Sequence, residues 1–223
     1  MEKYSPGGIT AVVPALNEQD SIRAVIEGLK PLADEIIVVD GHSRDRTAEI
    51  ARKCGASVLF DEVGKGSAVR KGFSEARGGI VVMVDADCSH RPEEVAKAVK
   101  KIREGYDVCM PSRFMEGGGS EDITPLRVFG NGFYKFWVRL FWGVSYTDIC
   151  YGFRAFSRSA LKKLDLSADG FDLEVEIAIK TAKKGLKFVE IPSLELKRKS
   201  GSGKLGFWTS LVLDRRILLE LFD

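Results

Sequence analysis

The stretch Ile80-Val81-Val82-Met83-Val84, followed by Asp85-Ala86-Asp87, is the part of the sequence that decides the fold. Five consecutive apolar residues, most of them β-branched, are typical of a strand that is buried on both faces, as in a parallel sheet. Two acidic residues follow this strand directly. Because ligands of open α/β sheets bind beyond the carboxyl ends of the strands, we expect Asp85 and Asp87 to lie at a binding crevice.

Similar apolar runs lie on both sides of this stretch, at residues 9–13, 36–39, 57–60 and 107–110. Helical patterns separate them. Apolar residues share one helix face at 22–29 and another at 48–51, where Ser43 is the expected N-cap, and Pro92 followed by two glutamates indicates a third helix start. This order predicts an α/β fold with a mostly parallel, doubly wound sheet and right-handed crossovers.

The second half of the chain has a less regular pattern. It predicts a Gly-rich loop at 115–123, helices at 124–142 and 172–183, an edge or bulged strand at 187–197 that contains Pro192, a flexible loop at 200–204 and an amphipathic tail at 205–222. Six apolar residues of the 124–142 helix are expected to belong mostly to the core, and the alternative is an apolar surface that faces the acceptor: Phe133, Phe136, Trp137, Leu140, Phe141 and Trp142. No change of composition marks a domain boundary, so we expect a single domain.

The bulk composition excludes several classes of protein. A net charge of +2 argues against a dedicated nucleic-acid binder. The four cysteines form no C-x-x-C pair and there are two histidines, which favours reduced thiols over a zinc site and indicates the cytoplasm. No apolar stretch approaches the roughly 20 residues of a transmembrane helix, and no signal peptide is evident, so any membrane contact is expected to be peripheral.

The pair Asp85 and Asp87 predicts a metal site. Two carboxylates this close repel each other unless a cation or hydrogen-bond donors compensate them. Mg²⁺ or Mn²⁺ is held by one or two carboxylates and fills its remaining positions with phosphate oxygens and water, which suits a diphosphate ligand. The alternative is that both residues only shape the turn before the next helix. No G-x-G-x-x-G follows the first strand, and the glycines around Lys65 lack the spacing of a P-loop.

Polar residues also follow two other predicted strands, in Pro14-Ala15-Leu16-Asn17-Glu18 and in Asp40-Gly41-His42-Ser43. We expect all three strand ends to share one crevice. Further motifs are Gly64-Lys65-Gly66-Ser67-Ala68-Val69-Arg70, Ser89-His90-Arg91-Pro92, Ser112-Arg113-Phe114, Asp148-Ile149-Cys150-Tyr151-Gly152-Phe153-Arg154 and Arg198-Lys199-Ser200-Gly201-Ser202-Gly203-Lys204. In this order they span nearly the whole chain.

The chain thereby resembles the family-2 glycosyltransferases of the GT-A fold, in particular the dolichyl-phosphate mannose synthases and polyprenyl-phosphate glycosyltransferases. The resemblance implies one GT-A domain, with a nucleotide-binding half at 1–112, an acceptor half with loops at 113–205 and an amphipathic tail at 206–223. It implies a nucleotide-sugar site formed by Pro14, Ala15, Asn17, Glu18, Asp40, Lys65, Arg70, Asp85, Ala86, Asp148 and Arg154. It further implies Mg²⁺ or Mn²⁺ at Asp85, Asp87 and Ser89, acceptor-phosphate contacts from Arg113, Arg198 and Lys204, and catalytic roles for Asp87, Arg113 and Arg198.

Several of these residues have simpler interpretations. Glu18 could be an acidic residue favoured by the start of a helix, and Arg70 could belong to a solvated face. Asp148 either orients Arg154 or contacts the sugar. Asp45 and Thr47 are expected to serve local structure, as is His90. Gly41 stands where the family usually has a second acid, and Tyr151 where the mannose synthases usually have a serine, so GDP-mannose and UDP-glucose both remain candidate donors.

The reaction implied is an inverting hexose transfer to dolichyl or polyprenyl phosphate. An ionised phosphate can attack the anomeric carbon without a general base, whereas a sugar hydroxyl requires one. Six basic and three acidic residues lie from 197 to 223, which suits an anionic lipid head group and a peripheral position on the cytoplasmic face of a membrane. One alternative is a soluble phosphorylated or saccharide acceptor, with Glu121-Asp122 or Glu174 and Glu176 supplying a base. The other is a non-catalytic subunit that binds nucleotide sugars.

Overall fold

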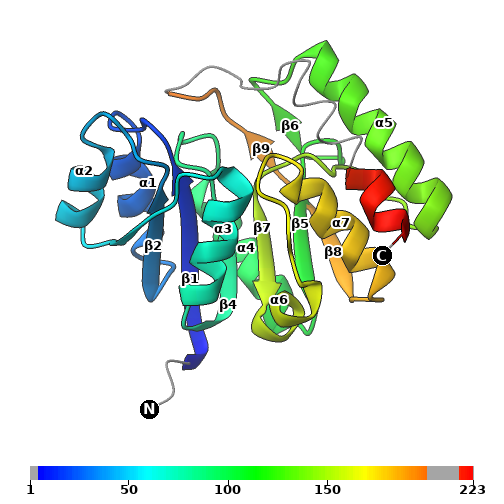
Figure 1. Cartoon of the computed structure of the whole chain (residues 1–223), viewed down its shortest axis with the longest axis horizontal. Coiled ribbons are helices and arrows are strands. Elements are labelled where there is room, and N and C mark those ends of the chain that lie inside the picture. The colour runs from blue at the N-terminus through cyan, green and yellow to red at the C-terminus, as the bar shows by residue number, and fades with distance from the viewer. Residues whose placement is uncertain (1–4, 200–215, 223) are drawn as a thin grey trace.

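The computed structural model describes residues 5–199 and 216–222. Within them the main sheet has seven strands, in the order β3-β2-β1-β4-β7-β5-β8. Their bounds are β1 (Ser5–Ala15), β2 (Glu35–Asp40), β3 (Ser57–Phe60), β4 (Gly78–Met83), β5 (Val108–Ser112), β7 (Arg154–Ser157) and β8 (Phe188–Pro192). A separate two-stranded sheet pairs β6 (Gly119–Ser120) with β9 (Leu194–Glu195). Figure 1 shows one continuous sheet crossing both halves of the chain.

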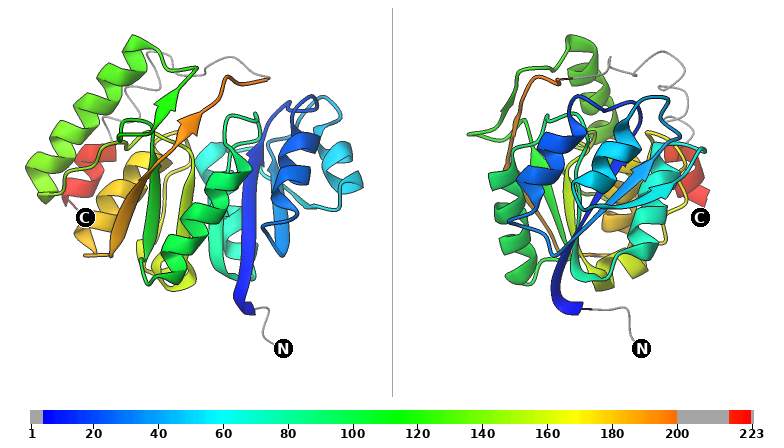
Figure 2. Two further views of the ribbon diagram at one scale, coloured as in Figure 1. Left: turned by 180° about the vertical axis from the view of Figure 1, so that it is seen from behind. Right: turned by 90° about the vertical axis from the view of Figure 1, so that its left-hand side faces the viewer.

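Helices cover both faces of the main sheet (Figure 2). One face packs against α1 (Ile22–Leu29), α2 (Thr47–Lys53) and α4 (Pro92–Arg103). The other packs against α3 (Lys65–Glu75), α6 (Arg158–Leu164) and α7 (Leu173–Lys183), and α5 (Pro125–Trp142) packs on α7. The predicted fold class, a mostly parallel doubly wound α/β sheet, is therefore confirmed.

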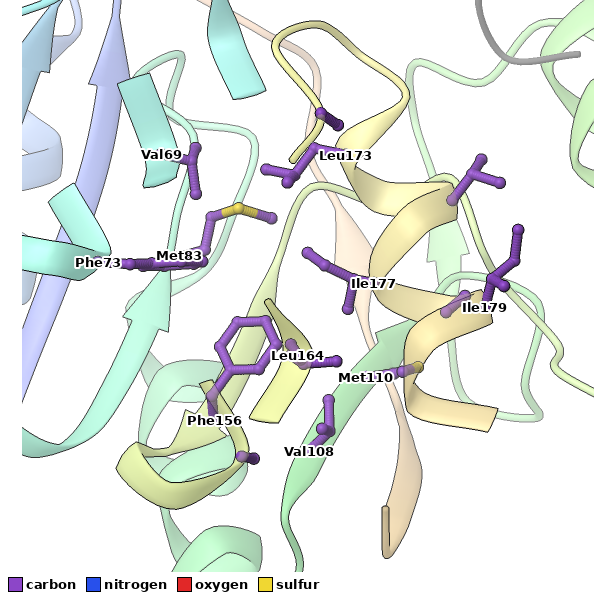
Figure 3. Close-up of a cluster of buried hydrophobic side chains, with 14 of the residues drawn as sticks. Val69, Phe73, Met83, Val108, Met110, Phe156, Leu164, Leu173, Ile177 and Ile179 are labelled. Carbon is purple, nitrogen blue, oxygen red and sulfur yellow. The ribbon is translucent and has the colours of Figure 1, made fainter. Parts of the chain in front are cut away.

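The second of these faces holds a large apolar core (Figure 3). Phe73 of α3 and Phe156 of β7 meet edge to face at 5.4 Å between ring centroids, and Met83, Leu164 and Ile177 surround them. Each fully buried side chain of this size contributes about 1.5–3 kcal/mol to stability. This core fixes α7 and the loop before it beside the carboxyl ends of the strands.

The strand order reverses beside β1. The chain adds β2 and β3 on one side of β1, then returns and adds β4 on the other side. Since β1, β2 and β4 are parallel, their carboxyl ends lie at the same edge, and a crevice forms at this reversal. All five strands predicted in the first half are present, within a few residues of the expected bounds.

The second half contains three short elements that the sequence pattern did not predict: β6, which lies within the expected Gly-rich loop, β7 and α6. β7 runs antiparallel between β4 and β5, and α6 follows it directly, with the Ser157 hydroxyl accepting the Ala160 N–H at 3.1 Å. The predicted strand at 187–197 is present as β8, at the edge of the main sheet, and β9. The expected N-cap at Ser43 is wrong, because α2 begins at Thr47 and the Ser43 hydroxyl accepts the Asn17 N–H instead.

The predicted helix at 124–142 is present as α5, but its aromatic residues do not form core as expected. Phe133, Phe136, Leu140 and Phe141 are exposed, and Trp137 and Trp142 are half-buried. Residues buried on the other side of the helix are Asn131, Tyr134 and Val138. No helix of the described residues has the length and apolar character needed to cross a membrane. Of the predicted tail, residues 216–222 are helical.

Candidate functional site

A cavity of about 1200 Å³ lies at the carboxyl edge of the sheet. Its wall combines the ends of β1, β2 and β4 with α5, α7 and β9. The three strand ends thus share one crevice, as predicted. The predicted site residues that line it are Pro14, Ala15, Glu18, Lys65, Asp85, Ala86, Asp87, Ser89, Arg113 and Arg198.

The loops after β1 and β2 are hydrogen-bonded to each other. The Asn17 N–H donates to the Ser43 hydroxyl and the Arg44 N–H donates to Asn17 Oδ1, both at 2.8 Å. The Glu18 N–H donates to the Thr47 hydroxyl, also at 2.8 Å. Asn17 has a φ of 58°, a left-handed conformation that asparagine tolerates. Asn17 therefore shapes this loop, whereas Glu18 faces the cavity.

Asp40 ends β2 and is fully buried. Its Oδ1 accepts the Ser43 N–H at 2.7 Å, while its buried Oδ2 has no hydrogen-bond partner among the described residues. A buried carboxylate oxygen without a donor is unfavourable. The adjoining Val39 and Gly41 line the cavity. A ligand N–H or O–H that reached Oδ2 from this side would satisfy it.

Lys65, Asp85 and Glu174 form a three-membered ionic cluster in the cavity. Lys65 Nζ lies 2.8 Å from Asp85 Oδ1 and 2.9 Å from Glu174 Oε1. Burial lowers the pKa of Lys65, but the two carboxylates outweigh it and raise that pKa above its usual value. Gly152 permits this arrangement, because a Cβ there would overlap the Asp85 carboxylate and lie 3.1 Å from Lys65 Nζ. The cluster fixes the Lys65 ammonium near the strand ends, between two carboxylates.

His90 packs beneath Asp85. Its Nδ1 accepts the Asp85 N–H at 3.1 Å, and its ring contacts Tyr151 and Phe153. Burial lowers the pKa of His90, and Asp85 opposes this effect only in part. The lowered pKa keeps the imidazole neutral at neutral pH. His90 is therefore placed to hold the turn in shape, as the sequence indicated.

Asp87 is the more available of the two carboxylates among the three predicted metal ligands, Asp85, Asp87 and Ser89. Its Oδ1 accepts the Ser89 N–H at 3.0 Å, and its Oδ2 lies 3.9 Å from Arg198 Nε. The described residues contain no group of three or more His, Cys, Asp or Glu side chains that could hold a metal. Two carboxylates fit an Mg²⁺ or Mn²⁺ ion whose other ligands are phosphate and water. The residues present therefore fit the predicted ion when a diphosphate is bound with it.

Arg113 is held in a buried ion pair. Its guanidinium contacts both Asp148 oxygens, at 2.7 and 3.0 Å, and Glu195 at 3.2 Å. Burial lowers the pKa of Arg113, but these two carboxylates raise it further than burial lowers it. The ring of Tyr151 lies under the guanidinium, 4.7 Å from ring centroid to Cζ. Arg113 reaches the cavity wall, yet both neighbouring acids already neutralise it.

Two more arginines stand at this end of the cavity. Arg127 Nη2 lies 3.0 Å from Glu195 Oε1, and Arg198 Nη2 lies 2.6 Å from Asp122 Oδ2. Burial raises the pKa of Glu195, but Arg113, the Ser120 hydroxyl and Arg127 outweigh it, so its carboxylate stays ionised. The three arginines and the carboxylates of Asp122, Asp148 and Glu195 thus form one network at this end of the cavity.

Some predicted residues lie elsewhere. Arg70 donates to Ala168 O at 3.0 Å and pairs with Asp169, and it does not line the cavity. Arg154 is fully buried and donates to the carbonyls of Phe153 and Ile149. These positions argue against direct donor contacts for Arg70 and Arg154, and Asp148 likewise holds Arg113 instead of facing the cavity. Lys204 lies outside the described residues.

Sequence reasoning missed Arg127, Glu195 and Gly152 as members of the site. Arg127 follows Thr124 and Pro125 in the first turn of α5, where a basic residue opposes the helix dipole. Glu195 stands between Leu194 and Leu196 in the predicted edge strand. The sequence signal that could have identified Arg127 and Glu195 is a charged residue at a position where local structure does not favour one.

The sequence profile of glycosyl transferase family 2 matches residues 10–165. Glycosyltransferase AglJ of Haloferax volcanii is 32% identical over 206 residues, which cover 89% of this chain and 66% of AglJ. A dolichol-phosphate mannosyltransferase of Pyrococcus furiosus is 31% identical over 209 residues, covering 88% of this chain and 59% of that protein. The chain thus spans about two thirds or less of the length of these two relatives.

Among solved structures, a glucosyl-3-phosphoglycerate synthase from Mycobacterium tuberculosis superposes with a TM-score of 0.78 at 23% identity. The match covers 97% of this chain and 80% of that one. That structure contains Mn²⁺, uridine diphosphate and glucosyl-3-phosphoglycerate. At this identity the likeness shows a common fold, in agreement with the predicted GT-A architecture.

Proposed function

This chain belongs to glycosyl transferase family 2, and from that premise we propose that it transfers a hexose from a nucleotide sugar to a polyprenyl phosphate with inversion. The family match confirms the resemblance seen in the sequence and the expectation of a glycosyltransferase. The candidate donors are GDP-mannose and UDP-glucose, and the proposed cofactor is Mg²⁺ or Mn²⁺. Dolichyl and other polyprenyl phosphates are the proposed acceptors.

One observation carries the choice of acceptor: the two carboxylates that line the cavity at the end with the three arginines are held in ion pairs with those arginines. Asp122 is paired with Arg198 and Glu195 with Arg113 and Arg127. Glu195 is a poor general base because Arg113 and Arg127 lower its pKa, and the Asp122 carboxylate is held in its ion pair with Arg198. A phosphate acceptor needs no such base, and it could take over the contacts of Arg127 and Arg198.

The soluble-acceptor alternative assigned a base to Glu121-Asp122 or to Glu174 and Glu176. Glu121 accepts the Lys197 N–H and does not line the cavity. Glu174 is paired with Lys65 at the donor end. Glu176 is fully buried on α7, where it accepts the N–H groups of Ser167 and Ala168 and contacts Lys180. Because both glutamates are already paired, the structure supports a phosphate acceptor, which is ionised and needs no general base.

The donor end suits a nucleoside diphosphate. We assign Pro14, Ala15, Glu18 and Asp40 to the nucleoside, and Lys65 with Asp85, Asp87 and Ser89 to the diphosphate and its cation. When bound, that cation would supply Lewis-acid stabilisation of the leaving diphosphate. An acceptor phosphate oxygen attacks the anomeric carbon, the bond from that carbon to the diphosphate breaks, and Lys65 stabilises the charge released.

The protein's setting follows from the same proposal. A polyprenyl phosphate lies in a membrane, so the enzyme would work at its surface, peripherally on the cytoplasmic face. The name of the Pyrococcus relative supports a lipid-phosphate acceptor. The basic loop that contains Lys204 and residues 206–215 of the tail, expected to contact this surface, lie outside the described residues.

A transfer assay tests the proposal. The purified chain is incubated with radiolabelled GDP-mannose or UDP-glucose, Mn²⁺ and either a polyprenyl phosphate or 3-phosphoglycerate. We expect label in the organic-solvent extract with one donor, dependent on the cation and abolished by chelator. Label in 3-phosphoglycerate alone would overturn the acceptor, and nucleotide binding without any transfer would favour a non-catalytic subunit.

Asp87→Asn is the sharpest variant for this assay. The amide keeps an oxygen that accepts the Ser89 N–H, but it removes the negative charge that we propose binds the metal ion. We expect initial rates to fall by about three orders of magnitude, with an unchanged melting temperature in the absence of ligand. Glu93→Gln, an exposed carboxylate on α4, serves as the control. Full activity of Asp87→Asn would refute its proposed role.

A further inference from the structure

The outer face of α5 is apolar, which is unusual for a surface helix. Its most exposed large side chains are Leu126 (69%), Phe129 (72%), Phe136 (59%) and Leu140 (58%). Their spacing puts them, with the partly exposed Phe133, on one stripe along the helix. Contiguous exposed apolar surface on a soluble domain marks a site of interaction.

This stripe is not a core face that happens to be open. The opposite face of α5 is already packed: Asn131, Tyr134 and Val138 are buried. Asn131 also fixes the rotation of the helix, since its Nδ2 donates to Thr147 O at 3.2 Å and its Oδ1 accepts the Ile149 N–H at 2.9 Å. The packed opposite face and the Asn131 hydrogen bonds therefore fix the stripe on the outside of the molecule.

The charge on α5 has one sign. The helix contains Arg127, Lys135 and Arg139 and no acidic residue. By contrast, α4 buries its apolar residues and mixes Glu93 with Lys97, Lys100 and other charged side chains. Arg127 pairs with Glu195, which leaves Lys135 and Arg139 as the outer basic residues. Basic residues beside an exposed apolar stripe suit an anionic lipid surface, where acyl chains contact the stripe and head groups contact the cations.

The stripe is continuous with the cavity. Leu126, Phe129 and Phe133 line the cavity as well as the surface of α5. Arg127, one position after Leu126, turns inward to Glu195. Figures 1 and 2 show α5 at an outer edge of the molecule, beyond the carboxyl ends of the strands. A surface laid along α5 would meet the mouth of the cavity.

We propose that α5 is the membrane-docking element, lying in the plane of an anionic bilayer with its apolar stripe in the region between head groups and acyl chains. Its length of about 27 Å, from 18 residues at 1.5 Å each, lies along the surface. The biological use of this contact rests on the proposed function, because a lipid phosphate could then enter the cavity without leaving the bilayer. The contact itself requires neither donor nor acceptor.

Vesicle sedimentation of the full chain tests this without any substrate. Vesicles of phosphatidylcholine with one third phosphatidylglycerol, free of polyprenyl phosphate, are titrated against wild type and against Phe136→Ser/Leu140→Ser, whose residues lie outside the cavity wall. We expect the double variant to bind at least about tenfold more weakly. Binding by the variant within twofold of wild type would overturn the proposal.

A matched variant compares α5 with the C-terminal segment. Leu218 and Leu219 are exposed by 58% and 44%, similar to Phe136 and Leu140. Leu218→Ser/Leu219→Ser is expected to bind within about threefold of wild type. Lys135→Gln/Arg139→Gln should lose the preference for anionic over pure phosphatidylcholine vesicles while keeping its melting temperature. Vesicle binding that is lost only in the Leu218/Leu219 variant would reject α5 as the docking element.

Two further outcomes are decisive. If light scattering finds a dimer that becomes monomeric in Phe136→Ser/Leu140→Ser, the stripe is an interface between copies and the proposal is overturned. Transfer to a water-soluble short-chain polyprenyl phosphate without vesicle binding would refute the docking role alone. Vesicle binding through α5 with transfer only to 3-phosphoglycerate would refute the proposed function alone.

Discussion

The donor and acceptor ends of the cavity are built differently. At the donor end, charged groups come from the ends of parallel strands. Among the described residues, Asp40 Oδ2 has no hydrogen-bond partner, and Asp87 Oδ2 lies 3.9 Å from Arg198 Nε. At the acceptor end, Arg113, Arg127 and Arg198 are each paired with acids from distant segments. The donor end therefore leaves carboxylate oxygens for a ligand. At the acceptor end the arginines hold the second half of the fold together, and an anionic ligand would have to compete with their carboxylate partners.

The largest effect should come from breaking the acceptor-end network. Arg113→Ala leaves Asp148, a fully buried carboxylate, without its main partner. Removal of one member of a buried ion pair costs about 3–5 kcal/mol. We expect the free energy of unfolding in urea to fall by that amount, with activity lost through instability.

Arg77→Ala is the control for this experiment. Arg77 also pairs with a glutamate, Glu35, but its side chain is 57% exposed. Exposed pairs contribute about 1 kcal/mol or less. An Arg113→Ala protein that is as stable as wild type but cannot use its acceptor would show that Arg113 binds substrate directly, and the contrast between the two ends would fail.

The donor end could be predicted because topology alone assembles it. Asp85 and Asp87 follow an apolar run, and parallel strands bring such ends together whatever the side chains between them do. Asp40 and Glu18 follow the same logic. The close approach of Gly152 to Asp85 could not be predicted in this way, since it depends on the loop before β7, a strand that the sequence pattern did not reveal.

The acceptor end could not be predicted because its partners are far apart in sequence. Arg113 is 35 residues from Asp148 and 82 from Glu195. An isolated charge fits solvent, a ligand or a buried partner equally well. The apolar face of α5 was predicted to be core for a related reason. The helix has apolar residues on both sides, and periodicity does not say which side packs against the rest of the domain.

A smaller effect is expected from a substitution that disturbs only the donor end of the cavity. In Gly152→Ala, the new Cβ would overlap the Asp85 carboxylate and displace Lys65. Overpacking of this kind costs about 1–3 kcal/mol, and we expect nucleotide-sugar affinity to fall by about tenfold or more, measured by calorimetry.

Gly132→Ala is the control, because Gly132 is an interior residue of α5 with nothing within 4 Å of its Cβ position. That variant should be slightly more stable, by up to about 1 kcal/mol. Equal donor affinity in both variants would contradict the tight fit at Asp85.

The smallest effect concerns pH and again tests the acceptor end. Arg113 and Arg127 hold the pKa of Glu195 below its usual value of 4.5, against the opposing effect of burial. The folded state therefore binds fewer protons here than the unfolded state, so the stabilisation is complete above about pH 4.5 and is lost as the pH falls through the lower folded pKa. In Glu195→Gln this contribution is absent, and the free energy of unfolding should depend less steeply on pH between about 5 and 3 than in wild type. Glu93→Gln, whose side chain is 72% exposed, should keep the wild-type slope. Parallel slopes for wild type and Glu195→Gln would mean that the arginines do not depend on Glu195, and the acceptor end would then be as open to a ligand as the donor end.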